Sequence, residues 1–131
     1  MNLQVVRMII ITMLSVIMAG CADNTKNKVV YMSSGDEFVL SKKCVAGVRM
    51  DPYVFNSKEI YSVSLRLKNT EDCSQKLNNI IKENIGNRLF TYLNGKLLID
   101  AYIASELKTE NGFRMSVSNK ELAEDILSFY R

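Results

Sequence analysis

A strictly alternating segment at residues 60–67 constrains the fold most. Its odd-numbered side chains are apolar, and its even-numbered ones are mostly polar. Successive side chains of a β-strand point to opposite faces of a sheet, so the pattern predicts a strand with one buried and one solvent-facing side. Half-buried strands are typical of antiparallel sheets. We therefore expect an antiparallel sheet with a core on one face.

Short β-rich runs recur on both sides of this segment. Asn94-Gly95 separates two of them, and Asn-Gly in that position is the strongest short signal for a hairpin with a type I′ turn. Asp51-Pro52 is expected to end the run that precedes it, because proline lacks a ladder donor. The further predicted strands are residues 29–32, 37–40, 44–50, 88–93, 96–103 and 113–117.

Two segments carry the period of an amphipathic helix. Residues 71–85 place four apolar residues on one side, with Asn69 or Thr70 as N-cap and Gly86 just beyond the C-terminus. A capping box from Ser118 to Glu121 opens a second helix that runs to about Tyr130. The apolar positions are Cys73, Leu77, Ile80 and Ile81 in the first helix, and Leu122, Ile126 and Phe129 in the second.

The order of strands, helix, hairpin, strand and helix predicts an α+β fold. An antiparallel sheet would carry both helices on one face, in a single domain.

The N-terminal segment is predicted to be a targeting signal. Residues 8–19 are almost wholly apolar, and Arg7 is the one charged residue among the first 20. As a helix, twelve residues span about 18 Å, well short of a bilayer core of about 30 Å. A short basic region followed by a short apolar region is typical of a secretory signal.

The sequence Met18-Ala19-Gly20-Cys21 resembles the bacterial lipobox. The resemblance implies cleavage before Cys21 and lipid, palmitate included, on its thiol and amine. A plain signal peptide and an uncleaved anchor are the alternatives. Because Ala22 rather than aspartate follows Cys21, the family rule implies the outer membrane facing the periplasm. The expected organisation is a signal at 1–20, a lipidated cysteine and flexible tether at 21–28, and a periplasmic domain at 29–131.

The remaining cysteines, Cys44 and Cys73, are expected to form a disulfide. An oxidising compartment favours pairing, and Cys73 lies on the apolar side of its helix, where a strand carrying Cys44 could meet it. Two separate buried thiols are the alternative. No Cys-x-x-Cys pair is present, so redox chemistry is not expected.

The composition argues against catalysis. The 131 residues include no histidine, which removes Ser-His and Cys-His chemistry and histidine-ligated metals. Three cysteines cannot form a Cys₄ zinc site. Glu121 and Asp125 lie one helical turn apart, but a solvated helix face explains them. We expect no catalytic residues, no metal, no cofactor and no enzyme activity.

The net charge argues against nucleic-acid binding. Loss of Arg7 with the signal lowers the net charge from +3 to +2, and this positive charge is too small for a nucleic-acid-binding surface.

The C-terminal half resembles the head subdomain of the large periplasmic domain of SecD. The resemblance covers about residues 70–128 and rests on Asn84-Ile85-Gly86, the Leu93-Asn94-Gly95-Lys96 hairpin, Ala101 and the final strand and helix. It departs from the family at Tyr102, where the family has proline, and at Asn94, where it has aspartate. The resemblance implies a βαββ head-like unit, without the family's multi-helix membrane domain.

These observations favour a protein-binding module attached to the membrane through Cys21. The candidate interface residues are Tyr53, Phe55 and Tyr102, because aromatic residues often anchor interfaces. Tyr92 and Tyr102 are expected on opposite faces of their hairpin.

The leading hypothesis is an immunity lipoprotein that blocks an antibacterial, type VI-like toxin. An export or envelope-biogenesis accessory is the alternative. A small-ligand or lipid carrier ranks third, since the short chain leaves little room for a cavity.

Overall fold

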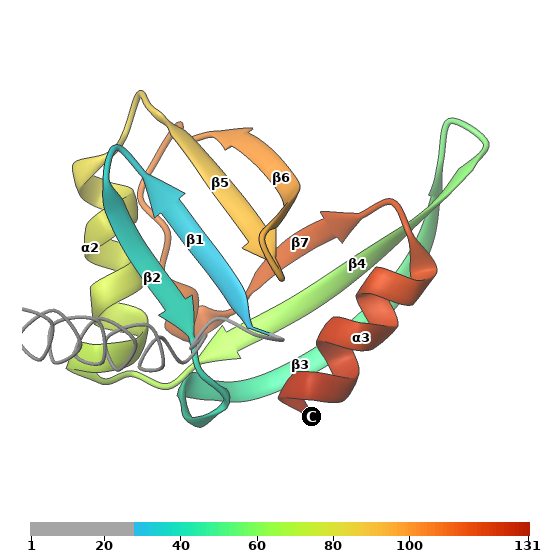
Figure 1. Cartoon of the computed structure of the whole chain (residues 1–131), viewed down its shortest axis with the longest axis horizontal. Coiled ribbons are helices and arrows are strands. Elements are labelled where there is room, and N and C mark those ends of the chain that lie inside the picture. Colours follow the sequence, from blue (N-terminus) through green and yellow to red (C-terminus); the bar gives the residue numbers. More distant parts are fainter. Residues whose placement is uncertain (1–27) are drawn as a thin grey trace, which may run out of the picture.

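The computed structural model describes residues 28–131 as one α+β domain, with residues 52–55 described by their backbone (Figure 1). The predicted signal segment and Cys21 lie outside the described residues. Among the described helices, none has the length and hydropathy needed to cross a bilayer. The predicted α+β class with antiparallel pairing is confirmed, but the strands form two sheets rather than one.

The first sheet has four strands in the order β2-β1-β5-β6. They are β1 (Val29–Ser33), β2 (Asp36–Leu40), β5 (Arg88–Leu93) and β6 (Lys96–Tyr102). β1 and β2 form one hairpin, β5 and β6 form another, and β1 pairs with β5 to join them. The predicted Asn-Gly turn is confirmed, because both of its residues have the positive φ of a type I′ turn.

The second sheet has three strands in the order β3-β4-β7. They are β3 (Val45–Phe55), β4 (Lys58–Leu67) and β7 (Phe113–Val117). β7 pairs with the part of β4 from Tyr61 to Leu65, so the β3–β4 hairpin extends beyond it. In Figure 1 the tip of this hairpin projects away from the four-stranded sheet.

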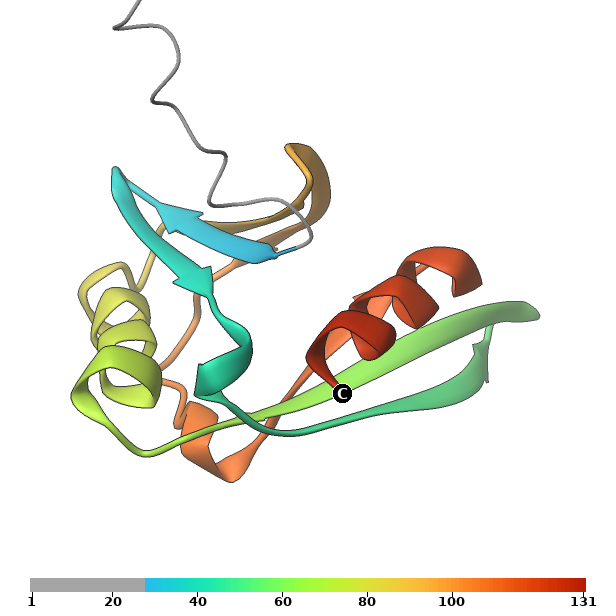
Figure 2. The same cartoon turned by 60° about the horizontal axis from the view of Figure 1, so that its bottom comes forward.

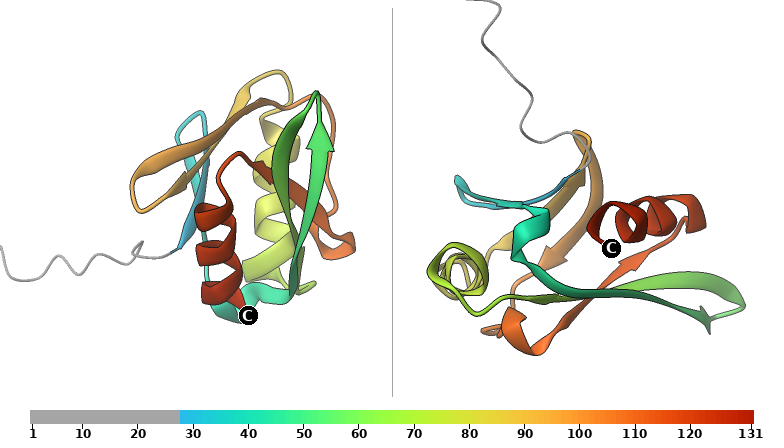
Figure 3. Two further views of the ribbon diagram at one scale, coloured as in Figure 1. Left: turned by 90° about the vertical axis from the view of Figure 1, so that its right-hand side faces the viewer. Right: turned by 90° about the horizontal axis from the view of Figure 1, so that it is seen from below.

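The two helices contact different sheets. α3 (Lys120–Tyr130) contacts β3, β4 and β7, whereas α2 (Lys76–Glu83) contacts β2 and follows a π-helical turn, η3 (Glu71–Gln75). Figures 2 and 3 show α3 over one part of this sheet and the four-stranded sheet with α2 over the other. The core therefore fills the space between the two sheets, closed at one end by α2 and at the other by α3.

The core consists of side chains from every layer. β4 contributes the alternating apolar residues that the sequence indicated, and each is at most 8% exposed. Tyr31 of β1 joins the sheets, because its hydroxyl lies 3.0 Å from the Met115 sulfur of β7 and its ring packs edge-on against Phe113. The largest fully buried apolar side chains are Phe38, Leu40, Leu65, Leu67, Leu77, Ile126, Val29 and Val63.

The prediction that Asp51-Pro52 ends a strand is wrong. β3 continues through Pro52 to Phe55, and Pro52 pairs with Tyr61 in the antiparallel register. β3 is an edge strand, with β4 on one side. Proline is tolerated at a sheet edge because its missing N–H can face away from the ladder.

The predicted start of the second helix is one residue early, whereas the first helical turn begins at Glu71 as predicted. Asn119, not Ser118, is the N-cap of α3, and its side-chain oxygen accepts a hydrogen bond from the Glu121 N–H over 2.8 Å. Thr70 precedes the first turn at residue 71 but makes no side-chain cap. The regular part of the first helix starts at Lys76, after the π-helical turn.

The buried face of each helix follows its contacts. In α2 and η3 the predicted stripe of Cys73, Leu77, Ile80 and Ile81 is buried, as expected. In α3 the buried residues are Ala123, Ile126 and Tyr130, so the face is rotated from the predicted one. Leu122 and Phe129 are partly buried at its margin.

Candidate protein-binding surface

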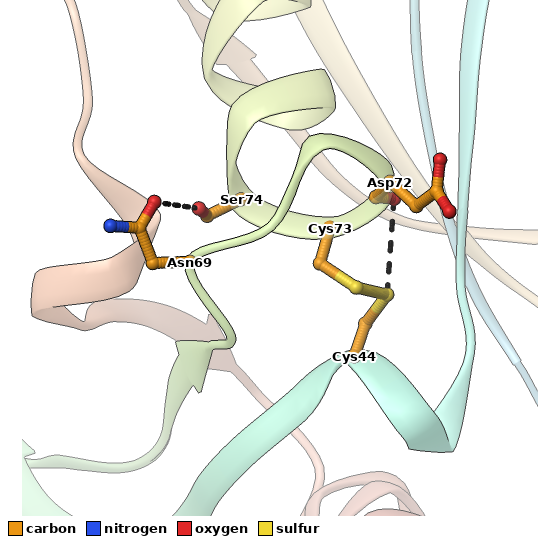
Figure 4. The surroundings of a disulfide bond; sticks show 5 residues. All are labelled: Cys44, Asn69, Asp72, Cys73 and Ser74. Atoms are coloured by element: carbon orange, nitrogen blue, oxygen red, sulfur yellow. Dashed lines mark hydrogen bonds between the residues drawn. A yellow bond between two sulfur atoms is a disulfide. The ribbon is translucent and has the colours of Figure 1, made fainter.

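The predicted disulfide is present and joins two short turns at one end of the domain. Cys44 ends η2 (Lys42–Cys44) and Cys73 lies in η3, with Cα atoms 5.2 Å apart. Both residues are buried, and the Cys44 sulfur lies 3.8 Å from the Asp72 carbonyl oxygen (Figure 4). The bond ties the start of β3 to the start of α2.

A polar network holds the loop before β7 against α2. The Asn78 side-chain oxygen accepts hydrogen bonds from the N–H and hydroxyl of Thr109, at 2.9 and 2.7 Å. The Asn78 amide donates to the Glu110 carboxylate over 2.8 Å, and this bond is the main reason that the pKa of Glu110 is lowered. Thr109 is fully buried, so the network is structural.

The predicted interface residues lie in two separate places. Tyr102 ends β6, pairs with Arg88 and is 62% exposed. Tyr53 and Phe55 lie near the tip of the β3–β4 hairpin, in the other sheet. The structure therefore does not gather the three residues into one patch.

Tyr92 and Tyr102 share one face of the four-stranded sheet, contrary to the expected alternation. The register shifts by one residue between Thr91 and Tyr92, where β6 carries an extra residue. A one-residue shift moves the following side chains to the other face. As a result Tyr102 lies on the same face as Tyr92 and Phe90.

That outer face of the four-stranded sheet is apolar. The register places one row of side chains across all four strands and a second row beside it. None of the described helices covers this side of the sheet, as Figures 2 and 3 show. The rows contribute Val39, Val30, Tyr92 and Leu97, and then Met32 and Phe90.

These residues do not belong to the core between the sheets. Val30 is buried at 7% exposure but is absent from the core cluster; Val39, Met32 and Phe90 are partly exposed and are also absent from it, and Leu97 is 52% exposed. Contiguous apolar surface on a domain marks a site of interaction. We name the six residues of the two rows, together with Tyr102, the apolar sheet face.

The sequence contained a signal for this face, but it lies in whole strand segments and not in single aromatic residues. Residues 29–32 and 89–93 are apolar or aromatic at nearly every position, without the alternation seen in 60–67. Such runs are typical of strands that are covered on both faces. Here the structure covers one face of each run, which leaves the second available.

The polar groups around the apolar sheet face are few. Arg88 and Asp100 form an ion pair with each other between β5 and β6. Glu37 of β2 is exposed and lies beside Met32 in the register. Among the described residues, no group of three acidic or cysteine side chains is arranged to hold a metal ion.

Comparison with known proteins gives one structural similarity. The chain is similar to a solved structure of SecDF, described as a membrane component that enhances protein export, with 25% sequence identity and a TM-score of 0.48. The similarity covers 70% of this chain and 40% of the SecDF chain, so this chain spans less than half of that protein. No family model and no curated protein matches the sequence.

Proposed function

We propose that this protein is an envelope module that binds extended apolar segments of other polypeptides on the apolar sheet face. The apolar rows of this face carry the proposal, because Met32 and Phe90 are partly exposed and Leu97 is 52% exposed. A lipid on Cys21, which stays a sequence prediction, would hold the module at the membrane. We infer a role as an accessory in export or assembly of envelope proteins.

The edge of the same sheet supports an extended polypeptide as the ligand. β6 has a hydrogen-bonded neighbour, β5, on one side, and in the described part of the chain no strand pairs with its other side. The free peptide groups of an edge strand can pair with an added strand. A bound segment would then place alternate side chains against Leu97 and Tyr102, which are both exposed.

The chemistry of the face favours varied apolar segments over a single folded toxin. Discrimination between partners needs charges or polar groups that reject the wrong one. The charged pair at this face, Arg88 with Asp100, is internally neutralised. We therefore place the accessory role ahead of the immunity role, in which one toxin would be bound and blocked.

The test uses the purified full chain in a nonionic detergent and a fluorescent peptide with alternating valine and threonine. Anisotropy should show saturable binding. A second peptide with proline at alternate positions should bind about tenfold more weakly or worse, because proline cannot donate to the edge of β6. Equal binding of both peptides would contradict strand addition.

Matched variants locate the binding site. Leu97→Ser and Phe90→Ser should each weaken binding about tenfold without changing the melting temperature by more than a few degrees. Ile85→Ser is the control, because Ile85 is 46% exposed but lies beyond α2 and outside the face. Unchanged binding in both face variants would refute the proposed surface.

A cellular experiment separates the two roles. A photoreactive amino acid at Leu97 should crosslink several newly exported envelope proteins. Crosslinking to one toxin, together with sensitivity of a deletion strain to sibling cells, would instead support immunity and exclude the accessory role.

A further inference from the structure

The outer face of the three-stranded sheet carries a second feature, distinct from the apolar sheet face. β4 alternates, so its apolar residues point into the core and Ser62, Ser64 and Arg66 occupy the opposite face. Neither α2 nor α3 lies on that side, as Figure 2 and the right-hand view of Figure 3 show, and the short helix η4 (Thr109–Asn111) reaches only its margin, where Asn111 lines the surface. The exposed side chains of this face, such as Arg66, can therefore meet a ligand.

Three arginines surround Ser64. The register places Arg49 of β3 and Arg114 of β7 directly opposite Ser64, one on each side. Arg66 lies two residues further along β4, on the same face. Side chains opposite each other on neighbouring strands lie within about 5.5 Å at Cβ. Three arginines thus stand on the same face of the sheet around one serine.

One acidic side chain nearby, Asp51, neutralises only one of these arginines. Asp51 pairs with Arg49, with 3.1 Å between the Arg49 Nε and the carboxylate. Neither Arg66 nor Arg114 has an ion pair within the described part of the chain. Like charges side by side on a sheet are destabilising. An anion bound between them would relieve that repulsion.

Two serine hydroxyls at the site are buried without a hydrogen-bond partner. They are the Oγ atoms of Ser62 and Ser64, and Ser62 as a residue is 2% exposed. Buried hydroxyl groups in folded proteins are nearly always bonded, so each exception calls for an explanation. A ligand oxygen above Ser64 would supply the missing acceptor.

The surface is hollowed at this point. A groove of about 380 Å³ is lined by Arg49, Ser64, Arg66, Asn111 and the glycines at positions 47 and 112. An ideal Cβ on Gly47 would lie 3.5 Å from the Arg66 Nη2 atom, so the Arg66 guanidinium passes close over the bare backbone. The absence of a side chain at position 47 keeps this part of the groove open.

We propose that the groove binds a phosphate group, held by Arg49, Arg66 and Arg114 with the Ser64 hydroxyl as a further donor. Guanidinium groups bind phosphate oxygens in pairs of parallel hydrogen bonds. Three arginines and one aspartate leave two positive charges, which match a phosphate monoester at neutral pH and exceed the single negative charge of a diester. The phosphate can belong to a lipid headgroup or to a soluble phosphate.

The experiment follows the backbone amide signals of the full chain in phosphate-free nonionic detergent by two-dimensional NMR. Inorganic phosphate and glycerophosphoglycerol, a soluble phospholipid headgroup, are the two probes. At least one should shift the signals of Ser64 and Arg66 in a saturable manner. Tighter binding of the diester would assign the site to a lipid headgroup, and tighter binding of inorganic phosphate would assign it to a soluble phosphate.

Variants test whether the arginines carry the binding. Arg66→Gln and Arg114→Gln should each weaken binding of the preferred probe about tenfold, since each removes a charged donor pair. Arg131→Gln is the matched control, because Arg131 follows α3 on the opposite side of the sheet. Its affinity should stay within about twofold of the original.

Three results would overturn the proposal. The first is that neither probe shifts the amide signals of Ser64 and Arg66. The second is that the affinity for the preferred probe is unchanged in both arginine variants. The third is that sodium chloride at matched ionic strength shifts the same signals as much as the probes do. Binding of a polyglutamate peptide without binding of either phosphate probe would assign the face to an acidic protein and would also overturn it. Thermal unfolding of each variant confirms that the fold is retained.

Discussion

The hydroxyl group of Tyr130, at the end of α3, donates a hydrogen bond to the backbone carbonyl oxygen of Leu40 over 2.6 Å. The same oxygen of Tyr130 accepts a hydrogen bond from the Val29 N–H over 2.7 Å. One buried side chain therefore connects the last helix to the beginning of β1 and the end of β2. Residues about 100 positions apart are held together by these bonds.

Tyr130→Phe should destabilise the domain by about 1–3 kcal/mol, because it leaves a buried N–H and a buried carbonyl without their partner. For a domain of this size that corresponds to a fall in melting temperature of roughly 4–24 °C. Urea unfolding followed by circular dichroism measures the change. Tyr102→Phe is the control, since its hydroxyl is on an exposed side chain; equal stability of both variants would refute the role of Tyr130.

Stability should fall at alkaline pH. Burial raises the pKa of Tyr130 to about 12 and that of Tyr31 well above the usual 10.0. A raised pKa in the folded state means that the unfolded chain releases its proton first. The contribution is fully present below pH 10 and is lost as the pH rises through the folded-state pKa of about 12.

The measurement is the free energy of unfolding in urea between pH 8 and about 11.5. Tyr130→Phe should make the decline above pH 10 shallower, with the remaining slope carried by the tyrosines whose pKa is also raised, Tyr31 and Tyr61. An unchanged slope in this variant would show that Tyr130 does not titrate with folding.

Loss of the Cys44–Cys73 bond should destabilise the domain by about 3.5 kcal/mol. The bond closes a loop with a sequence separation of 29, and the loop-entropy model gives that magnitude. Urea unfolding with and without a reducing agent measures it, and a Cys44→Ala/Cys73→Ala double variant is the chemical control. Equal urea midpoints for the oxidised and reduced protein would contradict the prediction.

Asn78→Ala should destabilise the domain by about 1–3 kcal/mol, because Thr109 is fully buried and loses the acceptor for its N–H and hydroxyl. Asn111→Ala, in the same loop region, is the control and should have little effect.

The free energy of unfolding at acidic pH tests the other hydrogen bond of this network, from the Asn78 amide to the Glu110 carboxylate. The Asn78 amide lowers the pKa of Glu110 below 4.5, so its contribution is present above that pH and is lost as the pH falls through the lowered pKa. The Asn78→Ala variant should therefore lose stability less steeply in this range. If the original protein and the Asn78→Ala variant lose stability equally steeply at acidic pH, the hydrogen bond to Glu110 does not form in solution.

Local patterns determined most of the elements. The alternation at 60–67, the Asn94-Gly95 turn and the stripe from Cys73 to Ile81 each report an interaction between residues close in sequence, and all three are present. The disulfide was also predictable, because the stripe fixed the direction of Cys73. Each of these depends on local geometry and on burial of one face.

The tertiary structure decided how the strands are divided and which faces stay open. β1 pairs with β5, more than 50 positions away, which leaves the β3–β4 hairpin to pair with β7 and produces two sheets. The extra residue opposite Thr91 and Tyr92 turned Tyr102 toward Phe90. Arg49, Ser64 and Arg114 became neighbours only through the register of three strands. Periodicity along one strand shows which side chains share a face, but long-range pairing sets which strands lie beside it, and that depends on the whole chain.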